Sequence, residues 1–144
     1  MIIREFLPSD VDAVFEVEQR CFSEEKRSLN LLLSSVNSSN FIGFVLVENG
    51  AIGGFITANY CLDESDILTV AVDEEHRRKG YGVALLNALK DGLKSLGVNK
   101  IFLEVKSTNT PAISLYEKFG FAKISVRKNY YGNNLDAFIY CLEI

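Results

Sequence analysis

The feature that most constrains the fold is an apolar segment followed, across a short charged turn, by a long amphipathic helix. The segment Asp66–Val72 is nearly continuous in apolar character, which is typical of a strand buried on both faces. In the helix predicted over Gly80–Leu96, leucines recur along one face, and Gly97 stands where many helices end. A strand that leads into a helix is a unit of α/β sheets. We therefore expect parallel strand pairing around this helix.

The rest of the chain alternates between further strand and helix patterns. Additional strands are expected at Met1–Glu5, Phe41–Val47, Ile52–Tyr60, Lys100–Val105, Phe121–Arg127 and Asp136–Ile144. Additional helices are expected at Val11–Cys21, Ser28–Val36 and Thr110–Phe119. Asn49-Gly50, between two of the strands, is a strong hairpin signal. This order predicts a mixed α/β fold in a single domain that spans residues 1–144.

Length and charge narrow the class of protein. The chain has 144 residues, which suits one domain. Its net charge of −4 argues against a nucleic-acid binder, because such a protein needs a basic surface. No apolar stretch approaches the roughly 18 residues of a membrane span, and no signal-peptide pattern is present at the start. We therefore expect a cytoplasmic protein with no membrane partner.

The cysteines give no sign of a metal site. Cys21, Cys61 and Cys141 stand far apart among apolar neighbours. No pair has the spacing of zinc ligands, and the single histidine, His76, cannot complete such a site. We expect three free, buried thiols rather than a reactive cysteine, and no metal.

The densest chemical signal lies in the charged turn. Arg77, Arg78 and Lys79 precede Gly80 and Gly82 at the start of the long helix. Glycines allow close backbone approach, and a helix N-terminus carries partial positive charge, so the turn could bind a pyrophosphate. The same residues could also form an ordinary charged loop. However, three cations beside the N-terminus of their own helix are electrostatically unfavourable unless an anion binds there.

These residues resemble the signature of the GNAT superfamily of acetyl-coenzyme A-dependent N-acetyltransferases, which is Arg/Gln-x-x-Gly-x-Gly/Ala after a strand. Arg77, Gly80 and Gly82 match it in place. The likeness covers nearly the whole chain, and the run from Glu104 to Tyr131 is similar to the RimI type, the ribosomal-protein alanine N-acetyltransferases. The resemblance implies a central mixed, largely antiparallel sheet with a parallel pair at the acetyl-CoA site and about four flanking helices.

The resemblance also implies a binding site for acetyl-CoA as cosubstrate. Backbone groups of Val70, Ala71 and Val72 would bind the pantetheine arm. The residues that would hold the pyrophosphate are Arg77, Arg78, Lys79, Gly80, Tyr81, Gly82 and Val83. Asn109 would contact coenzyme A, and it could also act as the cap of the helix that follows it.

Two residues are candidates for proton transfer. Glu104 is the lone acid in an apolar strand and could simply lie on its solvated face. RimI-type enzymes place their base in this Leu-Glu-Val context, so the resemblance implies that Glu104 is the general base. Tyr116 could be a core residue. Its phenol, with a pKa of about 10, could also protonate a coenzyme A thiolate, and the resemblance implies this role of general acid.

The resemblance places the acceptor, a protein or peptide N-terminus, beside Phe22, Tyr130 and Tyr131. Both tyrosines lie in a polar stretch that we expect to be a connection between strands. The chain departs from the RimI pattern after Phe22, where the usual Pro-Trp is replaced by Ser23-Glu24. The acids in this segment could attract a cationic amine.

Together these features predict an N-terminal protein acetyltransferase that works by direct transfer in a ternary complex, with a ribosomal protein as a suggested acceptor. One alternative is a GNAT enzyme that acts on a small-molecule amine or a lysine side chain. A second is a non-catalytic acyl-CoA-binding sensor, against which the presence of both Glu104 and Tyr116 argues. The sequence leaves the oligomeric state open.

Overall fold

The computed structural model describes residues 1–22, 28–77 and 79–144. In these ranges the strands are β1 (Ile2–Glu5), β2 (Phe41–Glu48), β3 (Ala51–Cys61), β4 (Glu64–Val72), β5 (Lys100–Lys106), β6 (Ala122–Gly132) and β7 (Leu135–Glu143). The α-helices are α1 (Val11–Cys21), α2 (Leu29–Val36), α3 (Tyr81–Ser95) and α4 (Thr110–Phe119). A 3-10 helix, Glu74–His76, follows β4.

The strands form one sheet in the order β1-β2-β3-β4-β5-β7-β6. The pair β4–β5 is parallel and is joined through α3, whereas the other neighbouring pairs are antiparallel. This confirms the predicted mixed α/β class, the parallel pair and the four helices.

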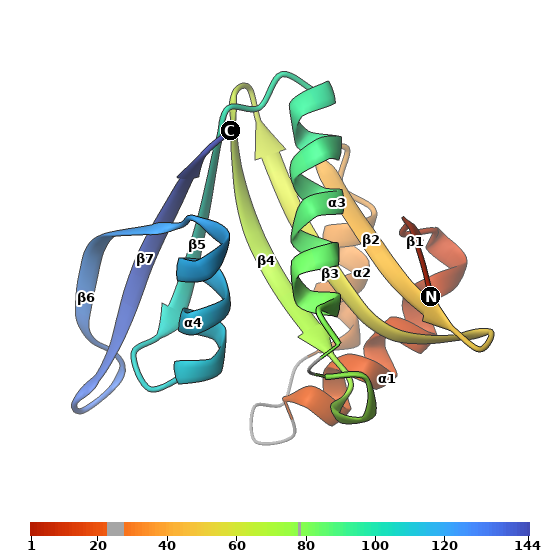
Figure 1. Ribbon diagram of the computed structural model, residues 1–144, viewed down its shortest axis with the longest axis horizontal. Coiled ribbons are helices and arrows are strands. Elements are labelled where there is room, and N and C mark those ends of the chain that lie inside the picture. The colour runs from red at the N-terminus through yellow and green to blue at the C-terminus, as the bar shows by residue number, and fades with distance from the viewer. Residues whose placement is uncertain (23–27, 78) are drawn as a thin grey trace.

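The parallel pair is short. Its register runs from Glu64 beside Lys100 to Asp66 beside Phe102, and no later residues of β4 and β5 are paired in the part of the chain that the structure describes. The two strands lie together at their starts and apart at their ends (Figure 1). We call the point where they separate the fork.

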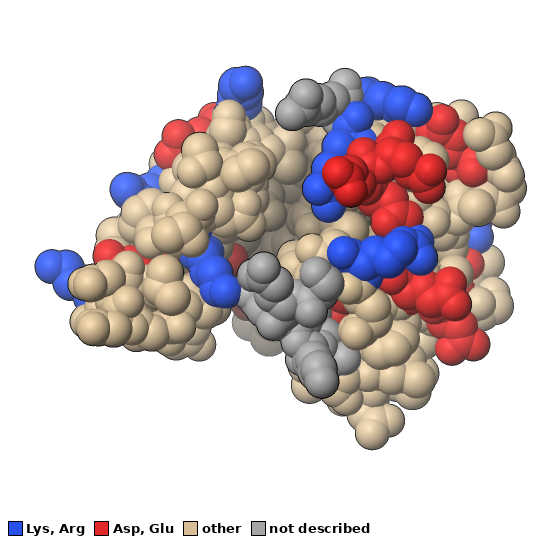
Figure 2. Space-filling model, turned by 90° about the horizontal axis from the view of Figure 1, so that it is seen from below, with Lys and Arg blue, Asp and Glu red and all other residues tan. Residues whose placement is uncertain are grey.

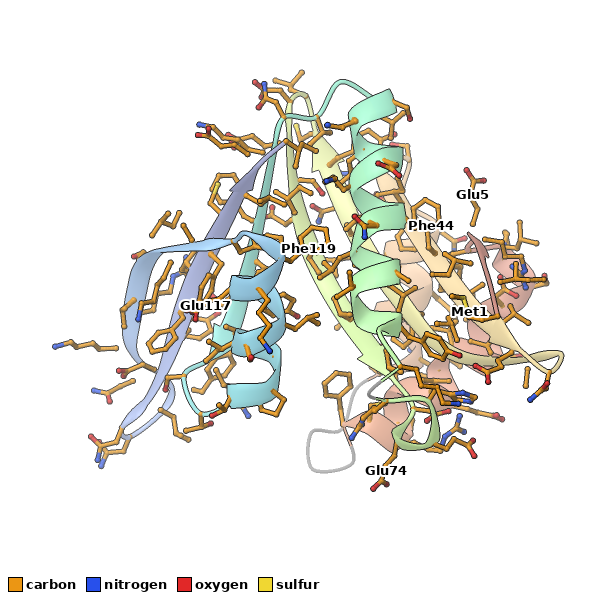
Figure 3. The ribbon with its side chains drawn as sticks, in the orientation of Figure 1. Met1, Glu5, Phe44, Glu74, Glu117 and Phe119 are labelled. Carbon is orange, nitrogen blue, oxygen red and sulfur yellow. The ribbon has the colours of Figure 1, made fainter. Side chains whose placement is uncertain are left out.

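Helices cover both faces of the sheet. In Figure 1, α3 and α4 lie in front of it, and α1 and α2 lie behind. Successive residues of β3 point to opposite faces: Ile56 packs in the core with α3 and α4, and Phe55 packs in the core with α1 and α2. Phe44 of β2 lies beneath α3 (Figure 3), where a Cβ on Gly92 would come within 3.0 Å of its ring. The glycine therefore allows α3 to lie close to the sheet.

Two expectations about burial were wrong. The strand β4 is not buried on both faces, since Leu68 is 42% exposed. Beyond the fork β4 has no β5 partner in the described residues, so part of the apolar run faces an opening rather than a neighbouring strand. The three thiols are free, but Cys61 at the end of β3 is exposed, and Cys21 and Cys141 are half-buried.

Among the described residues, no helix is long and apolar enough to cross a membrane.

Candidate active site

A cavity of about 660 Å³ lies at the fork. Its lining comes from the end of α1, the end of β4, the turn before α3, the first turn of α3, and α4. The predicted site residues in this lining are Phe22, Val70, Ala71, Val72, Arg77, Gly80, Tyr81, Gly82, Val83, Asn109 and Tyr116. Seen from below, the surface is hollowed between the two halves of the molecule, and Lys and Arg side chains stand among Asp and Glu along one side of the hollow (Figure 2).

Some predicted site residues lie elsewhere. Of those that the structure describes, Lys79, Glu104, Tyr130 and Tyr131 are outside the cavity lining. Arg78, Ser23 and Glu24 lie outside the described residues.

The end of β4 forms one wall of the cavity. Residues Val70 to Val72 pair with β3 on one side, and on the other side they have no strand partner in the described residues. A strand edge of this kind can bind an extended ligand through its backbone amides and carbonyls. The Val72 carbonyl accepts a hydrogen bond from Arg77 Nε at 2.9 Å, which holds the arginine at the edge of the cavity.

The two signature glycines, Gly80 and Gly82, are suited to their positions for different structural reasons. Gly80 adopts a left-handed conformation with φ of 77° at the N-cap of α3, and a Cβ there would meet no atom within 4 Å. A Cβ on Gly82 would lie 3.1 Å from Leu115 Cδ2, so this glycine lets α3 and α4 meet closely. Because the first amides of a helix have no intrahelical partners, the start of α3 is suited to an anion.

The helix α4 carries two of the predicted residues to the cavity. Asn109 caps the helix, since its side chain accepts a hydrogen bond from the Ala112 amide at 3.4 Å, and it also lines the cavity. The Tyr140 hydroxyl donates to Glu117 at 2.8 Å and ties α4 to β7. Phe119 lies on the side of α4 toward α3 (Figure 3), where Lys90 Nζ is 5.6 Å from its ring centroid. These contacts fix α4 on both sides.

Tyr116 is a core residue that also reaches the cavity, and its role as general acid stays a prediction. It belongs to the core under α3 and α4, with 8% exposure, and it lines the cavity. Burial raises the pKa of its phenol to about 12. The hydroxyl is therefore protonated throughout the neutral and moderately alkaline range.

Glu104 lies on the opposite face of the sheet. Leu103 and Val105 on either side of it are buried in the core under α3 and α4, so the side chain of Glu104 points the other way. It is exposed, as the solvated-face interpretation requires, but it has partners. Arg127 Nη1 lies 3.4 Å from Oε1, and the Tyr131 hydroxyl donates to Oε2 at 3.5 Å.

Tyr130 and Tyr131 lie in the strand β6 and not in a connection, which corrects the expectation from sequence. Register shifts separate Arg127 from Gly132 in the pairing with β7. The two rings meet edge to face with centroids 5.2 Å apart, and the Arg127 guanidinium lies 5.3 Å from the centre of the Tyr130 ring. The structure thus brings Tyr131 to Glu104.

Glu48 is a residue that sequence reasoning missed. Its carboxylate accepts a hydrogen bond from the Tyr81 hydroxyl at 2.5 Å and lies 3.5 Å from Lys79 Nζ. An acid before the Asn49-Gly50 hairpin looks like a surface residue in the sequence, and no pattern connects it to a turn about thirty positions later. Arg127, by contrast, stands in the segment that resembles the RimI type and could have been singled out there.

Comparison with known proteins agrees with this geometry. Residues 11–121 match the acetyltransferase (GNAT) family. The chain is 35% identical over 142 residues to the ribosomal protein bS18 alanine N-acetyltransferase of Escherichia coli strain K12, covering 94% of this chain and 93% of that protein.

Solved structures extend the comparison. The crystal structure of the ribosomal-protein-S18-alanine N-acetyltransferase from Escherichia coli superposes with a TM-score of 0.92 at 34% identity, over 99% of this chain and 93% of that one. An aminoglycoside 6'-N-acetyltransferase complexed with coenzyme A superposes with a TM-score of 0.87 over 99% of this chain and 97% of that one. At 20% identity it shares the fold alone. Enzymes of the GNAT family use acetyl-CoA. The family match over most of the chain, with a relative of 35% identity along nearly all of it, shows that this protein belongs to the acetyltransferase (GNAT) family.

Proposed function

We propose that the protein is an N-terminal acetyltransferase, which transfers the acetyl group of acetyl-CoA directly to the α-amine of a protein or peptide. The observation that carries this proposal is the arrangement at the fork. Tyr116, a buried phenol on one face of the sheet, lines the cavity, and Glu104, a carboxylate beside a tyrosine hydroxyl, lies on the other face. The likeness to an enzyme named for the alanine of ribosomal protein bS18 supports an α-amine, and a ribosomal protein, as acceptor.

The lining of the cavity fits acetyl-CoA. The edge of β4 at Val70 to Val72, which has no strand partner among the described residues, suits the amide-bearing pantetheine arm. The start of α3, with Gly80, Gly82 and Arg77 beside it, suits the pyrophosphate, because it offers backbone amides and a cation. When bound, acetyl-CoA supplies an activated thioester carbonyl at the fork.

Glu104 would accept the proton of the acceptor amine. An α-amine with a pKa of about 7.7–8.0 is mostly protonated at pH 7, so a base is needed to free its lone pair. The carboxylate can take this proton directly or through a water molecule. Its contacts with Arg127 and Tyr131 hold it on the face of the sheet opposite Tyr116.

Tyr116 would give a proton to the departing thiolate, and its raised pKa of about 12 keeps that proton in place until the thiolate forms. Cys21 also lines the cavity, but burial raises the pKa of its thiol despite the opposing effect of Arg77. A protonated thiol is a weak nucleophile. We therefore propose no covalent intermediate.

A peptide assay tests the proposed function. Coenzyme A release is measured with acetyl-CoA and a peptide library that varies the first two residues, with each peptide supplied in free and α-blocked form. We expect turnover only with free α-amines. Turnover with blocked, lysine-containing peptides or with small amines alone would support the alternative acceptors. Coenzyme A binding without turnover on any amine would support a sensor.

A further inference from the structure

We propose that Glu48 is a positioning residue for the phosphate-binding turn: from the end of β2, its carboxylate holds His76, Lys79 and Tyr81 in place. This inference rests on the proposed function of the turn.

Three residues of the turn converge on one carboxylate. Oε2 of Glu48 accepts the Tyr81 hydroxyl at 2.5 Å and lies 3.5 Å from Nδ1 of His76. Oε1 lies 3.5 Å from Nζ of Lys79. The Glu48 side chain is only 19% exposed, so water offers it few competing partners. The turn is thereby attached to a strand that is distant in sequence.

His76 docks the same turn onto β3. A Cβ on Gly53 would lie 2.5 Å from Cδ2 of His76, so the imidazole rests directly on the glycine backbone. The Asp73 amide donates to the Gly53 carbonyl at 2.8 Å. Nδ1 of His76 is buried and makes no hydrogen bond with any described residue. The Glu48 carboxylate is therefore a charged group facing this nitrogen at the inner end of the turn.

Glu48 acts from behind the cavity. Its partners His76 and Tyr81 line the cavity, whereas Glu48 is not among the described residues of the lining. A carboxylate in contact with a pyrophosphate would repel it. The favourable role for this charge is thus to orient the residues that face the ligand. The hydrogen bond from Tyr81 lowers the pKa of the Glu48 carboxyl, so Glu48 is ionised at neutral pH.

Loss of this contact should weaken ligand binding through the turn. A turn already in its binding conformation loses little conformational freedom when the ligand arrives. Without the carboxylate, His76, Lys79 and Tyr81 lose their common partner, and the turn samples other conformations. The apparent dissociation constant rises in proportion to the loss of the competent conformation.

The test compares two acetyl donors. Acetyl-CoA and S-acetylpantetheine carry the same thioester, but only the former has a pyrophosphate. For Glu48→Ala we expect the Kd of coenzyme A, measured by calorimetry, to rise about tenfold. We expect kcat/KM to fall about as much with acetyl-CoA and to stay unchanged with S-acetylpantetheine. Tyr81→Phe, which removes only the hydroxyl, should show the same donor dependence.

Two further variants complete the design. Glu48→Gln keeps an acceptor for the Tyr81 hydroxyl and should bind coenzyme A within about threefold of the wild type. Glu75→Ala is the matched control. That carboxylate is 81% exposed and lies 3.8 Å from His76, and it makes no described contact with Lys79 or Tyr81. We expect it to leave both donors unaffected.

An equal loss of kcat/KM with both donors in Glu48→Ala and Tyr81→Phe would overturn the proposal, since it would show a general effect on the domain. An unchanged Kd in both variants would overturn it as well. These results differ from failure of the proposed function, in which the wild type itself would not transfer acetyl to any α-amine.

Discussion

Tyr116 and Glu104 lie on opposite faces of the sheet, and Tyr116 lines the cavity at the fork whereas Glu104 lies outside its lining. Tyr116 is packed in the core, where burial holds its proton. Glu104 is exposed beside Arg127 and Tyr131, where an acceptor amine can arrive from solvent. Two groups in such different surroundings are suited to opposite directions of proton transfer.

The variant Tyr116→Phe tests the proposed role of Tyr116 as general acid. Because the pKa of Tyr116 is raised to about 12, the phenol stays neutral below that pH, and kcat of the wild type should show no loss from its ionisation between about pH 7 and 10. The variant keeps the ring and loses the proton, so we expect kcat to fall about 100-fold with little change in the KM of acetyl-CoA. Steady-state kinetics across this pH range give both values. Wild-type turnover in the variant would leave Tyr116 with a packing role only.

The variant Glu104→Gln tests the proposed role of Glu104 as general base. The acceptor amine is mostly protonated below its pKa of about 7.7–8.0, so loss of the base should depress kcat/KM by about 100-fold near pH 6.5 and by much less near pH 9. Glu143→Gln, an exposed carboxylate of β7 beside the closed end of the fork, is the control and should behave like the wild type. A pH–rate profile of the Glu104 variant parallel to that of the wild type would contradict the role.

Single residues differed in how far the sequence could predict them. Glu104 could be singled out as a candidate because one acid in an apolar strand is conspicuous, and the role of base that the family resemblance implies for it stays a prediction. Glu48 could not, because its role depends on how a hairpin packs against a turn distant in sequence. Such a contact is a property of tertiary packing and leaves no local pattern.

Among the helices and strands, those with a buried face could be predicted from the sequence. The helix α3 follows from its leucine spacing, because one face is packed in the core. The strand β6 is exposed along its length at the edge of the sheet. Its apolar alternation, at Ala122, Ile124 and Val126, stops before Arg127, so the end of the strand resembled a loop. Tyr130 and Tyr131 were misplaced for this reason. The continuous apolar pattern of β4 was misleading because the fork leaves part of it uncovered.

The connection between β1 and α1 gives a prediction about stability. Asp10 accepts two hydrogen bonds from Arg4, at 2.8 and 3.0 Å, and one from the Leu7 amide at 2.7 Å. The bond from Arg4 is the main cause that lowers the pKa of Asp10 below the ordinary 3.8. Asp10→Asn should lower the free energy of unfolding by about 2 kcal/mol at pH 7.

The sign of the pH dependence follows from that lowered pKa. The stabilisation from ionised Asp10 is complete above the unfolded-state pKa and is lost as the pH falls through the folded-state value. The stability difference between the wild type and Asp10→Asn should therefore be constant from pH 7 to 5 and shrink below about pH 4. Urea unfolding at several pH values measures it, with the exposed Asp12→Asn as control. A difference that grows in acid would contradict the assignment.

At the scale of the whole molecule, the charge balance and the cavity are compatible. The net charge is −4, yet cations stand at the edge of one cavity. This distribution suits a single small polyanion more than a long one. Identification of such a local site depends on a motif, because total charge reports only the sum over the surface.

Ligand binding should stabilise the entire fold. Coenzyme A at 100 times its Kd should add about 2.7 kcal/mol to the free energy of unfolding. For a chain of this size that is a rise of roughly 8 °C in the unfolding midpoint. Pantetheine at the same concentration, which lacks the pyrophosphate, should give a smaller shift. Differential scanning calorimetry measures both, and equal shifts with the two ligands would contradict a pyrophosphate site on the turn.

The shortness of the β4–β5 pairing has a mechanical consequence. Backbone pairing between the two halves of the sheet stops at Asp66 and Phe102, whereas one continuous core of side chains spans both halves. Apolar contacts are non-directional. The fork can therefore open by sliding of these side chains, and no ladder of interstrand hydrogen bonds has to break. The stiffness of the fork is set by the size of the core side chains near it, such as Leu103 and Val105. Trimming them should speed the escape of coenzyme A, which the rate constant of its dissociation measures.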